Sequence, residues 1–110
     1  MQNKYQLPDY GKAQALAVIR GYKAYKRDIE HEENYCKQLY VEAVDGALKE
    51  IFKDENPNFS LEVGNALVKS CIEGRRFSFT CSGVDSISCS TFYRLRNRFL
   101  FLIVKKLEET

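Results

Sequence analysis

Residues 99–104 are six consecutive apolar side chains near the C-terminal end of the sequence, Phe-Leu-Phe-Leu-Ile-Val. In a helix this run is apolar on every side, so it must also be covered on every side. It is too short to cross a bilayer, which takes about 20 residues, and residues 1–10 lack the apolar core of a signal peptide. We therefore expect a cytoplasmic protein that makes no membrane contact and whose other helices cover this run.

The residues just before this run predict an amphipathic helix that begins after Ser88 and ends near Glu108. Each residue of a helix turns by about 100°, which places several apolar side chains within about 80° of Phe92. These are Leu95, Phe99, Leu102 and Ile103. The opposite side carries hydroxyl, amide and basic groups. These are Ser90, Tyr93, Arg94, Asn97 and Arg98. The helix therefore combines a core-facing stripe with a polar, basic face.

This polar face has the chemistry of a helix that reads DNA. A helix N-terminus presents free N–H groups and a positive dipole end, which favour phosphate. In the major groove, arginine pairs with guanine and asparagine with adenine. We expect Arg94, Asn97 and Arg98 to contact bases or phosphates, and Ser90 and Tyr93 to contact phosphates. Arg75 and Arg76 are expected on the flanking DNA backbone, and Arg96 on a phosphate or an acid such as Glu30.

The charge of the chain is unevenly distributed. The whole sequence carries only +2, which indicates nothing about nucleic acid. Residues 75–106, however, contain seven basic residues and one acid, Asp85, which gives +6 for this segment and −4 for the remainder. A basic C-terminal third on an acidic chain indicates a polyanionic partner.

The first half of the chain, residues 1–53, predicts an N-terminal arm ending at Pro8, followed by one long helix or a helical hairpin bent near residues 30–34. Apolar residues recur at spacings of three and four. They are Ala15, Val18, Tyr22, Tyr25 and Ile29, and then Cys36, Leu39, Tyr40, Ala43 and Leu48. This stripe is consistent with a dimeric coiled coil, but it covers few heptads, and we favour burial in the core of one chain.

Residues 54–59, Asp-Glu-Asn-Pro-Asn-Phe, predict a linker loop. Residues 60–110 then form the second region, with a helix that starts after Ser60 and ends at Gly74 as a C-cap. Phe77 and Phe79 alternate with polar residues, which fits a short strand or a short, poorly formed helix. The whole chain is predicted to be one compact, mainly α domain. In it, the N-terminal helix or hairpin packs on a C-terminal helix-turn-helix-like unit.

The cysteines and the single histidine do not form a recognisable catalytic or metal site. The four cysteines show no Cys-x-x-Cys spacing, and His31 has no second histidine at metal-ligand spacing. We expect reduced, mostly buried thiols and no metal or other cofactor. The chain also lacks a glycine-rich phosphate loop and a nucleophile elbow, so an enzyme is not expected.

Residues 87–109, ISCSTFYRLRNRFLFLIVKKLEE, resemble the last helix of helix-turn-helix proteins with an ISxSTxYRxxRRxL pattern. Such endings occur in sigma-factor region-four-like domains and in phage late transcriptional activators of the RinA and ArpU type. Residues 19–29 are loosely similar to the start of RinA-like proteins. The resemblance implies promoter binding, contact with RNA polymerase, and a first motif helix over residues 77–86. By position it makes Ser88 the cap, places Ile87, Phe92 and Leu95 in the core, and directs the polar face of the helix to DNA.

We therefore expect a DNA-binding transcriptional regulator from a phage or mobile element, acting as a homodimer on paired half-sites. Two alternatives stay open. The chain could be a protein-interaction module that binds RNA polymerase or a phage protein through residues 99–104. It could also be a small DNA-packaging subunit.

Overall fold

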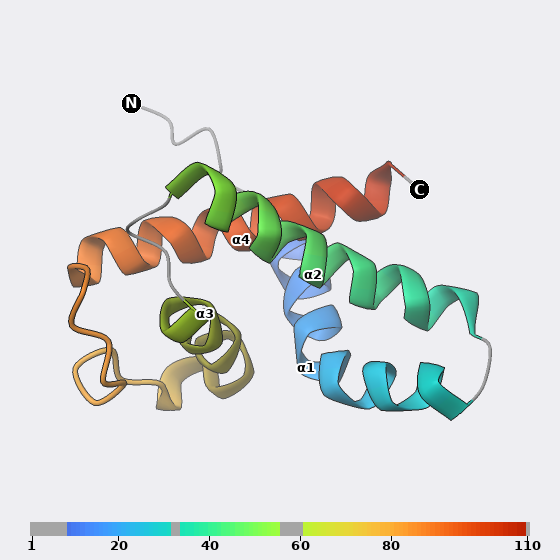
Figure 1. The fold of residues 1–110 in the computed structure, drawn as a ribbon, viewed down its shortest axis with the longest axis horizontal. Coiled ribbons are helices and arrows are strands. Elements are labelled where there is room, and N and C mark those ends of the chain that lie inside the picture. The colour runs from blue at the N-terminus through green and yellow to red at the C-terminus, as the bar shows by residue number, and fades with distance from the viewer. Residues whose placement is uncertain (1–8, 32–33, 56–60, 110) are drawn as a thin grey trace.

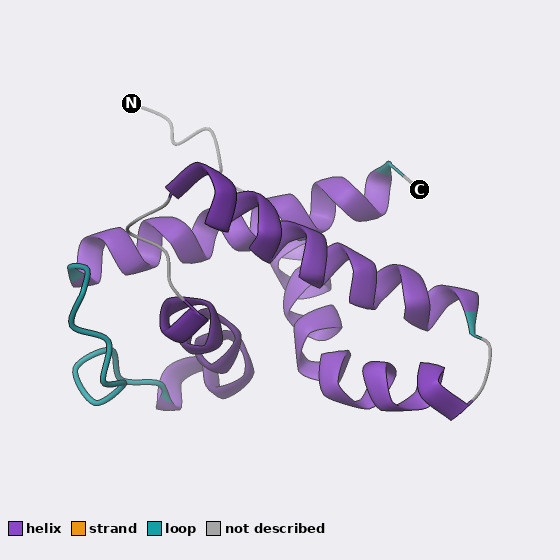
Figure 2. Cartoon of the chain, viewed as in Figure 1, coloured by secondary structure: helices purple, strands orange, loops and turns teal. Residues whose placement is uncertain are grey.

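The computed structural model describes residues 9–31, 34–55 and 61–109, and within these ranges the chain is helical with no strand (Figure 2). Four α-helices and one 3₁₀ helix follow in order. They are α1 (Asp9–His31), α2 (Tyr35–Glu55), α3 (Leu61–Glu73), η1 (Gly74–Arg76) and α4 (Cys89–Glu108). The predicted mainly α class is confirmed. Figure 1 shows α1 and α2 connected at one end of the molecule, with the α3–α4 connection at the other.

The N-terminal half is a helical hairpin, one of the two forms that the sequence allowed. The side-chain carboxamide oxygen of Asn34 accepts a hydrogen bond of 3.1 Å from the Lys37 backbone N–H, which caps the start of α2. Lys37 Nζ lies 2.9 Å from Asp28 Oδ2. The rings of Tyr25 and Tyr40 are 5.4 Å apart. Since the contacts move back along α1 as they move forward along α2, the two helices are antiparallel.

A tyrosine–carboxylate hydrogen bond links the same two helices nearer the core. The hydroxyl of half-buried Tyr22 donates to Asp45 Oδ1. Burial, together with this bond and the nearby negative charge, raises the pKa of Tyr22 to about 12 from its ordinary value of 10.0.

The Tyr22 hydroxyl is expected to stabilise the fold up to pH 10 and to lose this contribution between pH 10 and 12. The folded protein holds the phenolic proton more tightly than the unfolded chain, so stability falls once only the unfolded chain is deprotonated. The free energy of unfolding, measured by urea denaturation at several pH values in this range, should fall more steeply with pH for the wild type than for Tyr22→Phe. Tyr93→Phe, at an exposed position, is the matched control and should follow the wild type. If the free energy of unfolding falls equally with pH in the wild type and in Tyr22→Phe, the prediction is wrong.

Helix α4 crosses the molecule behind α2 in Figure 1 and contacts α1, α2 and α3. Its apolar run is covered as expected. Phe99, Leu100, Leu102, Ile103 and Val104 are buried, and Phe101 is half-buried. Lys106 Nζ lies 3.2 Å from Glu50 Oε2 of α2, and Arg98 pairs with Asp54 further along the same helix. These pairs show that α2 and α4 are antiparallel.

The apolar stripe of the first two helices is used inside the single chain. Ala15, Val18 and Ile19 of α1 and Ala43 of α2 are buried in the common core. Cys36 departs from the prediction, because it is exposed at the start of α2 instead of belonging to the buried stripe. The interpretation that we favoured, burial within one chain, describes this structure.

The end of α3 matches the sequence, but the connection to α4 does not. Gly74 has φ +59°, a left-handed conformation that suits glycine after a helix, as expected of a C-cap. Helices α3 and α4 contact each other, yet residues 74–88 connect them, whereas a helix-turn-helix uses about three or four residues. Residues 77–86 form no helix and no strand, so the first motif helix implied by the resemblance is absent from this segment.

Residues 77–88 instead form a loop held by apolar anchors. Phe77, Phe79 and Ile87 pack against the core, and Val84 is buried in it. Ser82 Oγ donates to the Phe79 carbonyl oxygen at 2.6 Å and accepts from the Val84 backbone N–H at 3.3 Å. The hydrogen bonds of Ser82 and the left-handed backbone of Gly83, whose φ is +83°, turn the chain here and are incompatible with a regular α-helix.

The predicted linker, residues 54–59, begins later than expected. Helix α2 continues through residues 54 and 55, and residues 56–59, with the predicted cap Ser60, lie outside the described residues. Across the described part of the chain, none of the helices combines the length and the apolar character needed to cross a membrane.

Candidate nucleic-acid interface

The front of α4 is fixed by a side-chain cap. Ser88 has extended backbone angles, φ −76° and ψ 161°, and its hydroxyl oxygen accepts a hydrogen bond of 3.1 Å from the Thr91 backbone N–H. The Ser88 hydroxyl also donates to Thr91 Oγ1 at 3.0 Å. The predicted cap is confirmed. The rest of the first turn presents backbone N–H groups and the positive end of the helix dipole.

Three of the predicted contact residues lie on the surface of the first turns of α4. Ser90 and Arg94 are exposed, and Tyr93 is 42% exposed. Asn97, one turn further on, is half-buried. A ligand lying along this face would meet a hydroxyl, a phenol and a guanidinium, followed by the accessible part of an amide. This combination can donate to phosphate and to base edges.

Arg98 is a correction to the predicted face. It is only 8% exposed and forms an ion pair with Asp54 near the end of α2. Arg98 lies about 120° from Phe92 around the helix, at the border of the apolar stripe, and α2 covers this flank. Its guanidinium therefore holds α4 on α2 and is not placed to contact DNA.

Arg96 lies on the opposite flank of α4 and faces α3. Its Nε donates a hydrogen bond of 3.3 Å to Ser70 Oγ, and Ser70 in turn donates to the Leu67 carbonyl oxygen at 2.8 Å. From the sequence we expected Arg96 to contact a phosphate or Glu30, but in the structure its partner is Ser70. Arg98 and Arg96 thus fasten the two flanks of α4, and Arg94 is the exposed arginine of the three.

Arg75 and Arg76 lie in η1, and the residue that follows them packs against the buried side of α4. Both arginines are exposed in η1, and Phe77 follows them directly. The Phe77 ring stacks on Phe92 of α4 with centroids 5.5 Å apart and planes inclined by 13°. This contact joins the chain next to Arg75 and Arg76 to the buried stripe of α4, and not to the face that carries Ser90 and Arg94.

Arg20 of α1 lies beside the start of η1 and was not identified from the sequence. It is exposed, and its Nη2 lies 4.0 Å from the position that a Cβ would occupy on Gly74. Its neighbours in the sequence give no signal for this position, because it depends on how α1 packs against α3. With Arg75 and Arg76, it forms a group of three exposed guanidinium side chains contributed by α1 and η1.

The cysteines are free, as expected, but they are not mostly buried. Cys71 is buried in α3, and this burial raises the pKa of its thiol. Cys36, Cys81 and Cys89 are exposed. No group of three or more potential metal ligands occurs within the described residues, and His31 is exposed at the end of α1.

The apolar segment 99–104 is not a surface in this structure. Five of its six side chains are buried among the helices of the same chain. The alternative in which this segment binds a protein partner therefore lacks the exposed patch that it requires.

Comparisons of the chain with protein-family models, with curated protein sequences and with solved structures find no match. The resemblance to phage late activators of the RinA and ArpU type stays a prediction.

Proposed function

We propose that the protein binds double-stranded DNA with the front of α4 in the major groove. One observation carries the proposal: a capped helix with an exposed hydroxyl, phenol and guanidinium face is held rigidly from behind by buried side chains. Ser90, Tyr93 and Arg94 would make the contacts on this face, with the accessible part of Asn97. Phe92 and Leu95 of the same turns are fully buried, so the face cannot rotate away from its position.

Arg75 and Arg76 would contact the phosphate backbone beside the groove, and Arg20 would add a third backbone contact. Guanidinium groups that contact phosphates favour a polyanion, because counterions are released when it binds. Four further points remain proposals that rest on the sequence resemblance. They are regulation of transcription, contact with RNA polymerase, an origin in a phage and action as a homodimer. In a dimer, two copies of α4 would read paired half-sites.

Arg94→Ala is expected to lower DNA affinity about tenfold and to reduce the salt slope by about one, because it removes one cationic contact. The measurement is titration of labelled duplex DNA from the gene's own neighbourhood at several salt concentrations. Sedimentation of the complex would give its stoichiometry. Lys105→Ala, an exposed charge in the last turn of α4, is the matched control and should change affinity by less than about twofold.

The choice of variant matters because the arginines of α4 have different environments. Arg98→Ala would disturb the core and is therefore unsuitable as a binding test. If the folded wild type fails to bind duplex DNA at low salt, or if Arg94→Ala binds as the wild type does, the proposal is wrong.

A further inference from the structure

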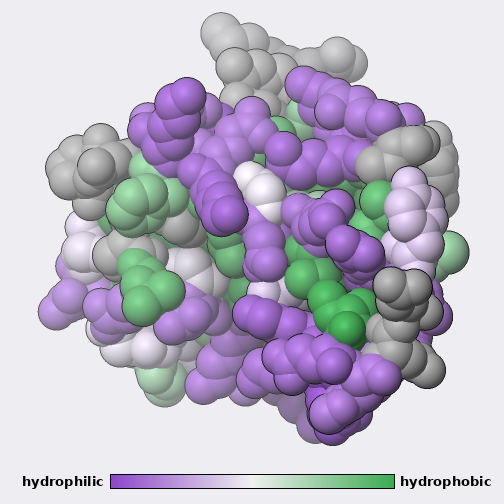
Figure 3. Space-filling view, turned by 45° about the vertical axis from the view of Figure 1, so that its right-hand side comes forward, coloured by the Kyte–Doolittle hydropathy of each residue, from purple (hydrophilic) through white to green (hydrophobic). Residues whose placement is uncertain are grey.

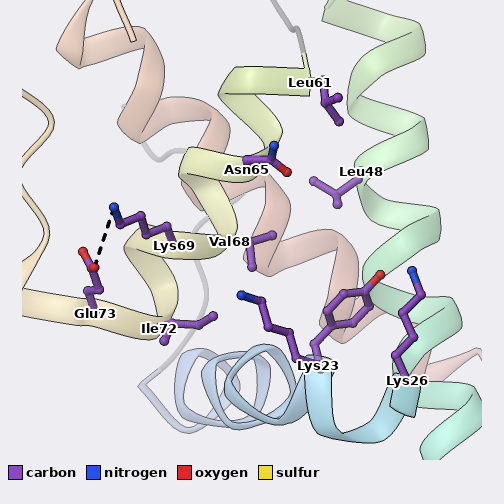
Figure 4. Close-up of a pocket in the computed structure, with 10 residues that line it drawn as sticks. Lys23, Lys26, Leu48, Leu61, Asn65, Val68, Lys69, Ile72 and Glu73 are labelled. Carbon is purple, nitrogen blue, oxygen red and sulfur yellow. Dashed lines mark ion pairs between the residues drawn. The ribbon is translucent and has the colours of Figure 1, made fainter. Parts of the chain in front are cut away.

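A groove of about 750 Å³ lies between α1, α2 and α3, away from the front of α4. One wall is a face of α3, whose contributing side chains recur at spacings of four, three and four. They are Leu61, Asn65, Val68 and Ile72. Tyr22 and Lys23 of α1 and Leu48 of α2 form the opposite wall. In Figure 4, Leu48, Val68 and Ile72 point into the space between the helices, and Lys23 reaches across it.

The α3 wall presents apolar surface that the fold leaves uncovered. Leu61 is 79% exposed and Ile72 is 39% exposed. A second hollow of about 270 Å³ adjoins the groove, shares Leu48 and Leu61 with it, and adds the half-exposed ring of Phe52. Figure 3 shows hydrophobic side chains at several separate places on one face of the molecule, between hydrophilic ones. Leu61, Val68 and Ile72 form an apolar strip along one side of α3 that the exposed amide of Asn65 interrupts. An apolar strip along one helix is a feature of interaction sites.

Lysines border this apolar floor. Lys23 and Lys26 stand on α1, Lys69 stands on α3, and Lys49 borders the adjoining hollow. The acidic side chain that lines the groove, Glu73, lies 4.0 Å from Lys69 Nζ (Figure 4). Within the described residues, no ion pair involves Lys23 or Lys26. The border therefore has a net positive charge that an acidic ligand would complement.

The length of the apolar strip indicates the shape of the ligand. Leu61 and Ile72 are separated by eleven residues, which is about three helical turns or roughly 16 Å. An amphipathic helix lays side chains at positions i, i+3 or i+4, and i+7 into such a groove. The exposed strip and its basic borders thus match a helix with an apolar stripe flanked by carboxylates.

We infer that this groove binds an acidic, amphipathic helical segment of a partner protein. The apolar stripe of the partner would cover Leu61, Val68 and Ile72, while its carboxylates would pair with Lys23 and Lys26 on the α1 side. The groove shares no residue with the proposed DNA-binding face, so this inference stands or falls separately from DNA binding.

The test uses a synthetic helical peptide of about three turns, with leucines at i, i+4 and i+7 and glutamates on both flanks. A second peptide carries lysines in place of the glutamates. Fluorescence anisotropy measures the affinity of each, and amide chemical shifts map the site on labelled protein. We expect the acidic peptide to bind at least about tenfold more tightly than the lysine peptide. Shifts should concentrate at Leu48, Val68 and Ile72 and spare Ser90 and Arg94.

Two variants probe the two halves of the proposed contact. Lys23→Glu/Lys26→Glu should weaken the acidic peptide about tenfold, and Ile72→Glu should weaken it by at least as much. Lys105→Glu, which makes one such charge reversal on the exposed part of α4, should alter affinity by less than about twofold. Circular dichroism would confirm that each variant is folded, and DNA titration should give wild-type affinity for Ile72→Glu.

Several outcomes would overturn the inference. One is an acidic peptide that fails to bind at about millimolar concentration, which is weaker than a specific site requires. Another is equal binding of the two peptides, or equal binding of the acidic peptide to wild type and to Ile72→Glu. A dimer that Ile72→Glu dissociates would show that a second copy of this chain occupies the groove.

Discussion

Replacing Phe92 with alanine is expected to lower the free energy of unfolding by about 3–5 kcal/mol, the usual cost of truncating a fully buried phenylalanine. Phe92 has no exposed surface and packs against two rings of the preceding loop. The Phe77 ring stacks on it at 5.5 Å, and the Phe79 ring lies 5.1 Å away at 44°. The cavity left by Phe92→Ala would uncouple the loop from α4. Urea denaturation followed by circular dichroism measures the loss.

Tyr93→Ala is the neighbouring control for this experiment. Tyr93 contacts the edge of Phe92 at 5.3 Å, but it is 42% exposed, so its truncation should cost less than about 1.5 kcal/mol. Hydrogen exchange provides a second readout, because the Val84 amide should lose protection in Phe92→Ala before the amides of α2 do. Equal losses of stability in the two variants would contradict the packing described for residues 77–88.

Asp54→Ala is expected to lower the free energy of unfolding by about 1–3 kcal/mol, because it removes a carboxylate that pairs with the buried Arg98 guanidinium. This loss of stability is smaller than that expected for breaking a fully buried ion pair, because the Asp54 side chain is 47% exposed and solvent screens its charge. Arg98→Met should cost less than Asp54→Ala, since methionine fills a similar volume and carries no charge to be compensated. Urea denaturation of both variants and of the double variant yields the coupling energy.

Glu50→Ala is the matched control for the second prediction. It removes the ion pair with Lys106, in which both side chains are partly exposed, and it should change stability by no more than about 1 kcal/mol. If Arg98→Met proves as costly as Asp54→Ala, then the arginine stabilises the fold through contacts other than its charge, and the account of this pair is wrong.

The helices were predictable where a local signal was strong. Ser88 lies at the position of a cap, and Phe92, Leu95 and Phe99 share one face, so the start of α4 and its buried stripe follow from spacing alone. Gly74 likewise marks the end of α3. The run at 99–104 required cover on all sides, which is what α4 receives from the three other helices.

Side chains at the borders of helix faces were not predictable, because their environment depends on which neighbour packs there. The spacing placed Arg98 and Arg94 on one face, but α2 covers only the flank that carries Arg98. The same limit applies to Arg20, whose closeness to Gly74 arises from tertiary packing.

The loop and the groove were missed for different reasons. Phe77 and Phe79 alternate as strand residues do, yet no partner strand exists within the described residues, and both rings pack against Phe92 instead. Leu61 and Ile72 belong to a helix that the sequence predicted, but they are exposed in the structure. A sequence pattern indicates which residues are apolar, but only the packed structure shows which side of α3 the other described helices leave uncovered.

The share of the core that α4 supplies has a consequence for synthesis of the chain on the ribosome. Helices α1 and α2 are translated first, but Val44 and Ile51 belong to a core that also requires Phe99 and Ile103. A nascent chain that has not yet exposed α4 therefore keeps these apolar surfaces open to water and to chaperones. Cooperative folding should begin only after α4 has left the exit tunnel, and a stop codon before residue 99 should yield a product that is rapidly degraded.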